Sequence, residues 1–171
     1  HTFIMSLDVS CARKIKEKMN INTIKSTYGY IGFTPFAFFS IIPWIFGGPI
    51  SQTAIIFQLA YGSIIITFLG GMAWGWRDDQ NKQIFNLSMG IFYSLVGCSI
   101  LLLTYFNYVL LALLISVVSF QSFYYFERST QDFKTRDEDY KKFRKMLSLL
   151  VAISFLISSA YWINPYSNPI T

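Results

Sequence analysis

The chain has 171 residues, of which 53% are hydrophobic and only 13% are charged, whereas a soluble domain of this size carries about a quarter charged residues. The apolar residues fall in long runs, and a run of about 20 apolar residues is what an α-helix needs to cross a bilayer. The net charge of +5 does not indicate nucleic-acid binding, because the basic residues lie in three short stretches beside apolar runs. That distribution is typical of contact with anionic lipid headgroups. We expect an all-α integral membrane protein that binds no nucleic acid.

Residues 1–27 form a polar and basic arm. Leu7, Cys11, Ile15 and Met19 recur at every fourth position, a spacing that would place them along one side of a helix. Two interpretations stay open: a helix that lies on the membrane surface, or a solvated arm that packs on a neighbour. The chain begins with His1, which fits either a mature form without its targeting peptide or the ordered part of a longer product.

Five apolar runs predict a transmembrane domain over residues 28–163. We expect its helices over residues 28–46, 52–76, 84–104, 107–126 and 146–163. Pro35 and Pro43 lie inside the first run, so we expect that helix to be kinked or broken. The glycine and proline residues at 47–49 should form the turn after it, and residues 164–171 should form an irregular tail.

Small residues mark the second span as the centre of the bundle. Ser63, Thr67, Gly71 and Gly75 are each four residues apart, and Gly70 lies beside them. This spacing predicts a groove in which another helix can approach closely. Gln58, Asn86 and Gln121 are polar residues inside the spans, and we expect them to form hydrogen bonds between helices.

The last span has a charged approach. An acidic stretch over residues 137–139 precedes a basic stretch over residues 141–145, the order that favours a helix beginning near Asp137. We expect that helix to continue as the fifth span, 146–163.

The distribution of basic residues predicts the orientation of the bundle. With five spans, the segments 1–27, 77–83 and 127–145 lie on one side and hold five, two and seven Lys and Arg, which are all fourteen in the chain. The positive-inside rule therefore places the N-terminus on the matrix or cytoplasmic side and the C-terminus on the opposite side.

Few residues suited to catalysis or metal binding are present. The only histidine is His1, and Cys11 and Cys98 lie in a basic segment and inside an apolar run, so we expect neither a metal site nor a disulfide. No Asp, Glu, Lys, Arg or His falls inside the five expected spans, whereas proton relays and ion-coupled carriers need such groups at membrane depth. We expect a protein that is not an enzyme and has no cofactor.

The second span also carries a family resemblance. Tyr61-Gly62, then the Phe-Leu-Gly-Gly run over residues 68–71, then Trp74-Gly75 resemble the pattern of a small family of five-span membrane proteins of unknown function. That family includes bacterial inner-membrane members and the mitochondrial transmembrane protein 69. Pro35-Phe36 and Tyr140 with Arg144 are weaker points of likeness, and the basic arm departs from the family. The resemblance implies a five-helix fold and an energy-transducing membrane, but no activity.

Our first functional hypothesis is a non-catalytic accessory subunit of a respiratory-chain or ATP-synthase complex in the mitochondrial inner membrane. Its role would be structural, filling space between other membrane subunits and holding lipid. We expect a set of basic residues to contact cardiolipin phosphates on the matrix face: Lys14, Lys16, Lys18, Arg77, Lys82, Lys142, Arg144 and Lys145. Among the complexes we favour cytochrome c oxidase, because membrane-embedded supernumerary subunits are common there.

Two alternatives remain open. A small transporter or channel for a neutral or lipid-like molecule would have a water-filled cavity that reaches the midplane of the membrane. A membrane-protein assembly factor would associate with its partners at less than one copy per complex.

Overall fold

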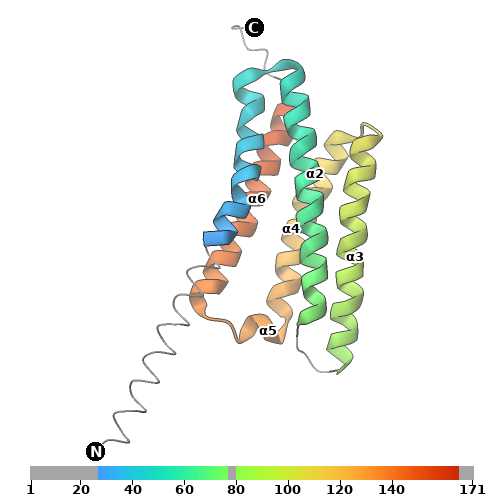
Figure 1. Cartoon of the computed structure of the whole chain (residues 1–171), viewed down its shortest axis with the longest axis vertical. Helices are drawn as coiled ribbons and strands as arrows, with labels where there is room; N and C mark the ends of the chain where they lie inside the picture. The colour runs from blue at the N-terminus through green and yellow to red at the C-terminus, as the bar shows by residue number, and fades with distance from the viewer. Residues whose placement is uncertain (1–26, 77–79, 166–171) are drawn as a thin grey trace, which may run out of the picture. The chain divides into compact units, whose positions relative to one another are not determined.

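The computed structural model in Figure 1 describes residues 27–76 and 80–165. Residues 1–32 and 33–171 form two units, and the packing below is that of the second unit. Within the described residues five helices are long and apolar enough to cross a membrane: Thr27–Phe46, Gly48–Gly75, Lys82–Tyr105, Val109–Ser129 and Glu138–Ile163. The prediction of an all-helical membrane protein with five spans is therefore confirmed. The basic arm over residues 1–26 and the tail beyond residue 165 lie outside the described residues.

The first helix is joined to α2 (Gly48–Met72) through a single residue, Gly47. Gly47 and Gly48 have φ angles of 66° and 56°, in the left-handed region that glycine adopts without a steric penalty. Pro49 lies in the first turn of α2, where its missing N–H has no partner to lose. The turn is therefore shorter than expected, and the second span begins at residue 48 rather than 52.

The first helix is continuous from Thr27 to Phe46, so of the predicted kink or break at Pro35 and Pro43 the break does not occur. The Pro43 carbonyl accepts hydrogen bonds from the Gly47 N–H at 3.2 Å and from the Ser51 hydroxyl at 3.2 Å. The Pro43 carbonyl thereby links the end of the first helix to the first turn of α2.

The next two helices, α3 (Gln80–Tyr105) and α4 (Val109–Ser129), form a hairpin around Asn107. Asn107 has a φ angle of 65°. The Tyr108 N–H donates to the Leu103 carbonyl at 2.8 Å, and the Asn107 N–H donates to the Thr104 carbonyl at 3.1 Å. These bonds form a Schellman motif, in which asparagine is the second choice after glycine. Asn107 therefore belongs to the turn that ends α3. The prediction that the fourth span begins at residue 107 was wrong, because α4 begins at Val109.

The core of the bundle is aromatic. Two helix pairs lie side by side, α2 with α3 and α4 with α6 (Glu138–Ile163). The Phe36 ring, from the first helix, is 4.9 Å from Tyr61 on α2, 5.8 Å from Phe120 on α4 and 5.5 Å from Phe155 on α6. Tilted and edge-on ring pairs at such distances stabilise a core beyond their buried area. Phe36 thus joins the first helix to three others.

Candidate functional site: a buried ion pair at the charged end of the bundle

All charged side chains of residues 27–76 and 80–165 gather at one end of the bundle. They belong either to the first turn of α3, with Lys82, or to the segment 127–145 that links α4 to α6. The two groups lie on the same side, because the Phe85 ring of α3 is 6.0 Å from the Phe126 ring of α4. The connections at the other end, Gly47 and 106–108, are uncharged.

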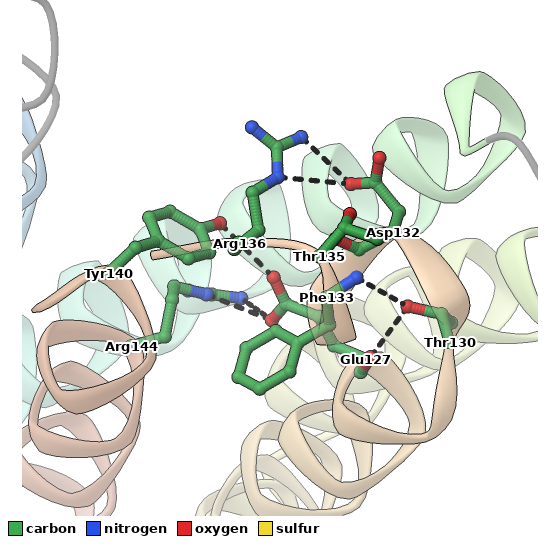
Figure 2. A network of polar contacts seen from close by, with 8 residues as sticks. All are labelled: Glu127, Thr130, Asp132, Phe133, Thr135, Arg136, Tyr140 and Arg144. Carbon is green, nitrogen blue, oxygen red and sulfur yellow. Dashed lines mark hydrogen bonds and ion pairs between the residues drawn. The ribbon is translucent and has the colours of Figure 1, made fainter. Parts of the chain in front are cut away.

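The centre of this charged end is Glu127, whose side chain is buried near the end of α4. Its Oε2 accepts hydrogen bonds from Arg144 Nε at 2.9 Å and from Arg144 Nη2 at 2.5 Å. Its Oε1 accepts a hydrogen bond from the Tyr140 hydroxyl at 3.3 Å. Figure 2 shows Tyr140 and Arg144, both on α6, pointing toward Glu127. Both carboxylate oxygens are therefore satisfied, as a buried charge requires.

The local sequence builds this geometry. Thr130 caps the short helix α5 (Gln131–Lys134): its hydroxyl donates to the Glu127 carbonyl at 2.7 Å and accepts from the Phe133 N–H at 3.3 Å. Asp137 then precedes the first residue of α6, as the order of charges predicted. Tyr140 and Arg144 are one turn apart on α6 and therefore share the face that meets α4.

A second layer of contacts covers the pair. Arg136 Nη2 is 2.8 Å from Asp132 Oδ2, and the Arg136 guanidinium lies 5.6 Å above the centre of the Tyr140 ring. The hydrogen bond to Asp132 raises the pKa of Arg136 above its ordinary value. The Phe133 ring is 6.3 Å from Tyr124 and 6.2 Å from Tyr140. The link between α4 and α6 is thus packed against the bundle (Figure 2).

The arrangement joins α4 to α6 by charged hydrogen bonds. Both oxygens of the Glu127 carboxylate are bound, one by Arg144 and the other by Tyr140. Across the described part of the chain, no group of three His, Cys, Asp or Glu side chains could hold a metal ion.

Farther along α6, away from the charged end, a polar contact links α2 to α6. Gln58 on α2 is fully buried, its Nε2 donates to Ser154 Oγ at 3.5 Å, and its Oε1 accepts from Ser158 Oγ at 2.5 Å. Between α4 and α6, Gln121 Nε2 donates to the Ser148 carbonyl at 3.3 Å. The prediction that Gln58 and Gln121 form hydrogen bonds between helices is confirmed.

The small residues of the second span, Gly48–Gly75, separate into two groups. The Ser63 hydroxyl donates to the Gly97 carbonyl of α3, and a methyl group on Gly97 would collide with Thr67 Oγ1. A Cβ built on Gly70 would lie only 2.6 Å from the Gly90 carbonyl oxygen. These residues therefore form the close contact with α3.

Gly71 and Gly75 do not belong to that contact. Both are exposed, and a Cβ on either would meet no atom within 4 Å. Of the residues expected to form the groove, Ser63, Thr67 and Gly70 therefore pack against α3. Gly71 and Gly75 do not. The reason is the partner glycines on α3, Gly90 and Gly97, which select the adjacent face of α2.

The expected lipid-contacting residues also divide. Lys82, Lys142 and Lys145 are exposed at the charged end, whereas Arg144 is turned inward and bound to Glu127. Lys14, Lys16, Lys18 and Arg77 lie outside the described residues.

Glu127 is the site residue that sequence reasoning missed. We ended the fourth span at Phe126 and placed no ionisable residue inside any span, but α4 continues to Ser129 and buries Glu127. The sequence feature that could have identified it is a single acidic residue at the end of a span, followed by a short link to Tyr140 and Arg144.

Comparison with known proteins places the chain in one family. The family described as "Protein of unknown function (DUF3429)" matches residues 22–160, well over half of the chain. No curated protein and no solved structure matches. The match bears out the expected membership of a family of unknown function.

Proposed function

We propose that this chain, which belongs to the DUF3429 family of proteins of unknown function, is a non-catalytic accessory subunit of a larger membrane complex. The carrying observation is the outer surface formed by α2 and α3. Only 22% of the most apolar stretch of α3 is buried, against 50% for α4. Beside it, Gly71 near the end of α2 and Gly75 in the short 3-10 helix that follows, Ala73–Gly75, are exposed with open space at the Cβ position. In membranes, such small residues let the backbone of another helix approach closely.

A hollow accompanies these glycines. It has a volume of about 420 Å³ and lies between α2 and α3, lined by Gly71, Trp74, Ile91, Ser94 and Leu95. A bulky side chain of a partner's transmembrane helix would fit there while its backbone lies along Gly71 and Gly75. We therefore assign the partner to the α2–α3 side of the bundle.

We assign the protein to the mitochondrial inner membrane, with its charged end in the matrix. The positive-inside rule supports this orientation, and the resemblance to the mitochondrial transmembrane protein 69 supports the compartment. On this face the basic residues would contact anionic phospholipid, with cardiolipin as the abundant candidate. Cytochrome c oxidase is the complex that we favour.

The test is blue-native electrophoresis of mitochondrial extracts in mild detergent, with quantitative mass spectrometry across the gel. We expect the chain to comigrate with one respiratory complex at one copy per complex. Gly71→Leu should release it from the complex, because the side chain would fill the approach to α2. Migration of the wild-type chain alone at low mass would refute the proposal, and association well below one copy would favour an assembly factor.

One observation favours a second candidate, a transporter for a lipid-like molecule. A groove of about 320 Å³ lies between α3 and α4, with Tyr93, Ser119 and Ser122 among its lining residues. The Tyr93 hydroxyl donates to Ser122 Oγ at 3.2 Å. Transfer of a fluorescent lipid between the leaflets of liposomes that contain the purified chain would support this candidate.

A further inference from the structure

A single face of α6 combines free positive charge with exposed apolar side chains. Lys142 and Lys145 are exposed in its first turns, and neither makes an ion pair among the described residues. Glu138, one turn before Lys142, is bound by Lys141 at 2.8 Å and interacts with Lys142 only through longer-range attraction. The two lysines are therefore available to an external anion.

The apolar part of this face continues directly from the lysines. It consists of four residues whose side chains are 55%, 53%, 42% and 49% exposed, in order Met146, Leu149, Ile153 and Leu156. Their spacing of three and four residues keeps them in one line with Lys142 and Lys145. From Lys142 to Leu156 the helix rises about 21 Å. That length covers a headgroup layer and one leaflet of a hydrocarbon core of about 30 Å.

We propose that this line of residues, which we call the α6 lipid face, binds one anionic phospholipid. Lys142 and Lys145 hold the phosphate, and an acyl chain lies along Met146, Leu149 and Ile153. An anionic phospholipid has both a charged phosphate for the lysines and an acyl chain for the apolar residues. A soluble phosphate would satisfy only the lysines, and an apolar helix would satisfy only the apolar residues. Arg144 takes no part, because Glu127 binds it on the opposite side. The inference deepens the lipid-holding role in the proposed function and rests on it.

Native mass spectrometry of the full chain, released from detergent micelles and titrated with cardiolipin, tests the proposal. Each lysine near an anionic surface contributes about 1 kcal/mol, so Lys142→Gln with Lys145→Gln should weaken cardiolipin binding roughly thirty-fold. Phosphatidylcholine binding should not change. The matched control is Arg128→Gln with Lys134→Gln, which removes the same charge from exposed residues at the same end of the bundle.

We expect the control to retain cardiolipin binding within about three-fold, less than the effect of one lysine. Equal loss in both double variants, or no loss in either, would overturn the α6 lipid face. Circular dichroism of both variants is the control that their helices are retained. Comigration in blue-native gels is scored separately: a chain that binds cardiolipin as predicted but migrates alone would refute the subunit role and leave the lipid site intact.

Discussion

Glu127 on α4 accepts two hydrogen bonds from Arg144 on α6, 17 residues farther along the chain. Between them the chain leaves one helix, forms α5 and enters the next helix. The pair therefore closes the link between two membrane-spanning helices at the end where all described charges gather. Removing one partner of a buried pair leaves the other charge without compensation, which costs more than the pair itself contributes.

Glu127→Gln should therefore lower the free energy of unfolding by about 3 kcal/mol. The measurement is equilibrium unfolding of the purified chain in mixed micelles. Glu138→Gln is the matched control, because Glu138 also binds a basic residue but is 76% exposed, and solvent screening should make its effect on stability much smaller than that of Glu127→Gln. Equal effects of the two substitutions would show that burial of Glu127 has no energetic role.

Gly70→Ala and Gly71→Ala are adjacent, chemically identical changes with opposite expected effects. The new methyl group at residue 70 would lie 2.6 Å from the Gly90 carbonyl oxygen, and backbone atoms cannot move aside cheaply. We expect a loss of about 1–3 kcal/mol. At residue 71 the methyl group meets open space, so the higher helix propensity of alanine should leave stability unchanged or raise it by up to about 1 kcal/mol. The same unfolding assay compares them, and a loss at residue 71 would contradict the packing.

Phe155→Ala should leave a cavity at the junction of the first helix, α2 and α4. The Phe155 ring contacts Phe36 and Phe120 and lies against Gly62. Large-to-small changes at such positions cost about 3–5 kcal/mol. Phe68→Ala, at a side chain that is 63% exposed, removes the same atoms from the outer surface and should cost less than about 1 kcal/mol. Thermal unfolding of the two variants in the same detergent is the comparison.

Asn107 tests the turn between α3 and α4. Asn107→Val should destabilise the chain by about 1–2 kcal/mol, because a β-branched residue resists the left-handed conformation. Asn107→Gly should be neutral or slightly stabilising, since glycine is preferred at this position of a Schellman motif. If valine is tolerated as well as glycine, the turn does not require a positive φ angle.

Run length and charge order predicted the elements well, because both act locally. Apolar runs long enough for a bilayer identified the five spans, and the acidic-to-basic order identified the start of α6 near Asp137. The pairing of faces could not be predicted in the same way. Whether Gly70 or Gly71 meets α3 depends on where Gly90 and Gly97 fall on the other helix, which is a property of two helices together.

The candidate site was hidden for a related reason. Glu127 looked like the first residue of a loop, and only the docking of α6 makes it buried. The hydrogen bonding of Gln58 was easier to predict, because an amide side chain in an apolar span has few possible partners other than polar groups on a neighbouring helix. Its partners, Ser154 and Ser158, could not be chosen in advance among the serines of α6.

The continuity of α6 gives the Glu127–Arg144 pair an influence beyond its own end of the bundle. Arg144, Phe155 and Ser158 are carried by one uninterrupted helix, Glu138–Ile163, so its rotation about its own axis is shared by all three. Fixing Arg144 against α4 sets the azimuth at which Phe155 enters the aromatic core and Ser158 meets Gln58. One residue inserted between Arg144 and Phe155 would turn these two contact points about 100° apart. The Glu127–Arg144 pair at the charged end thus fixes the rotation of α6 about its axis, and with it the directions in which Phe155 and Ser158 point.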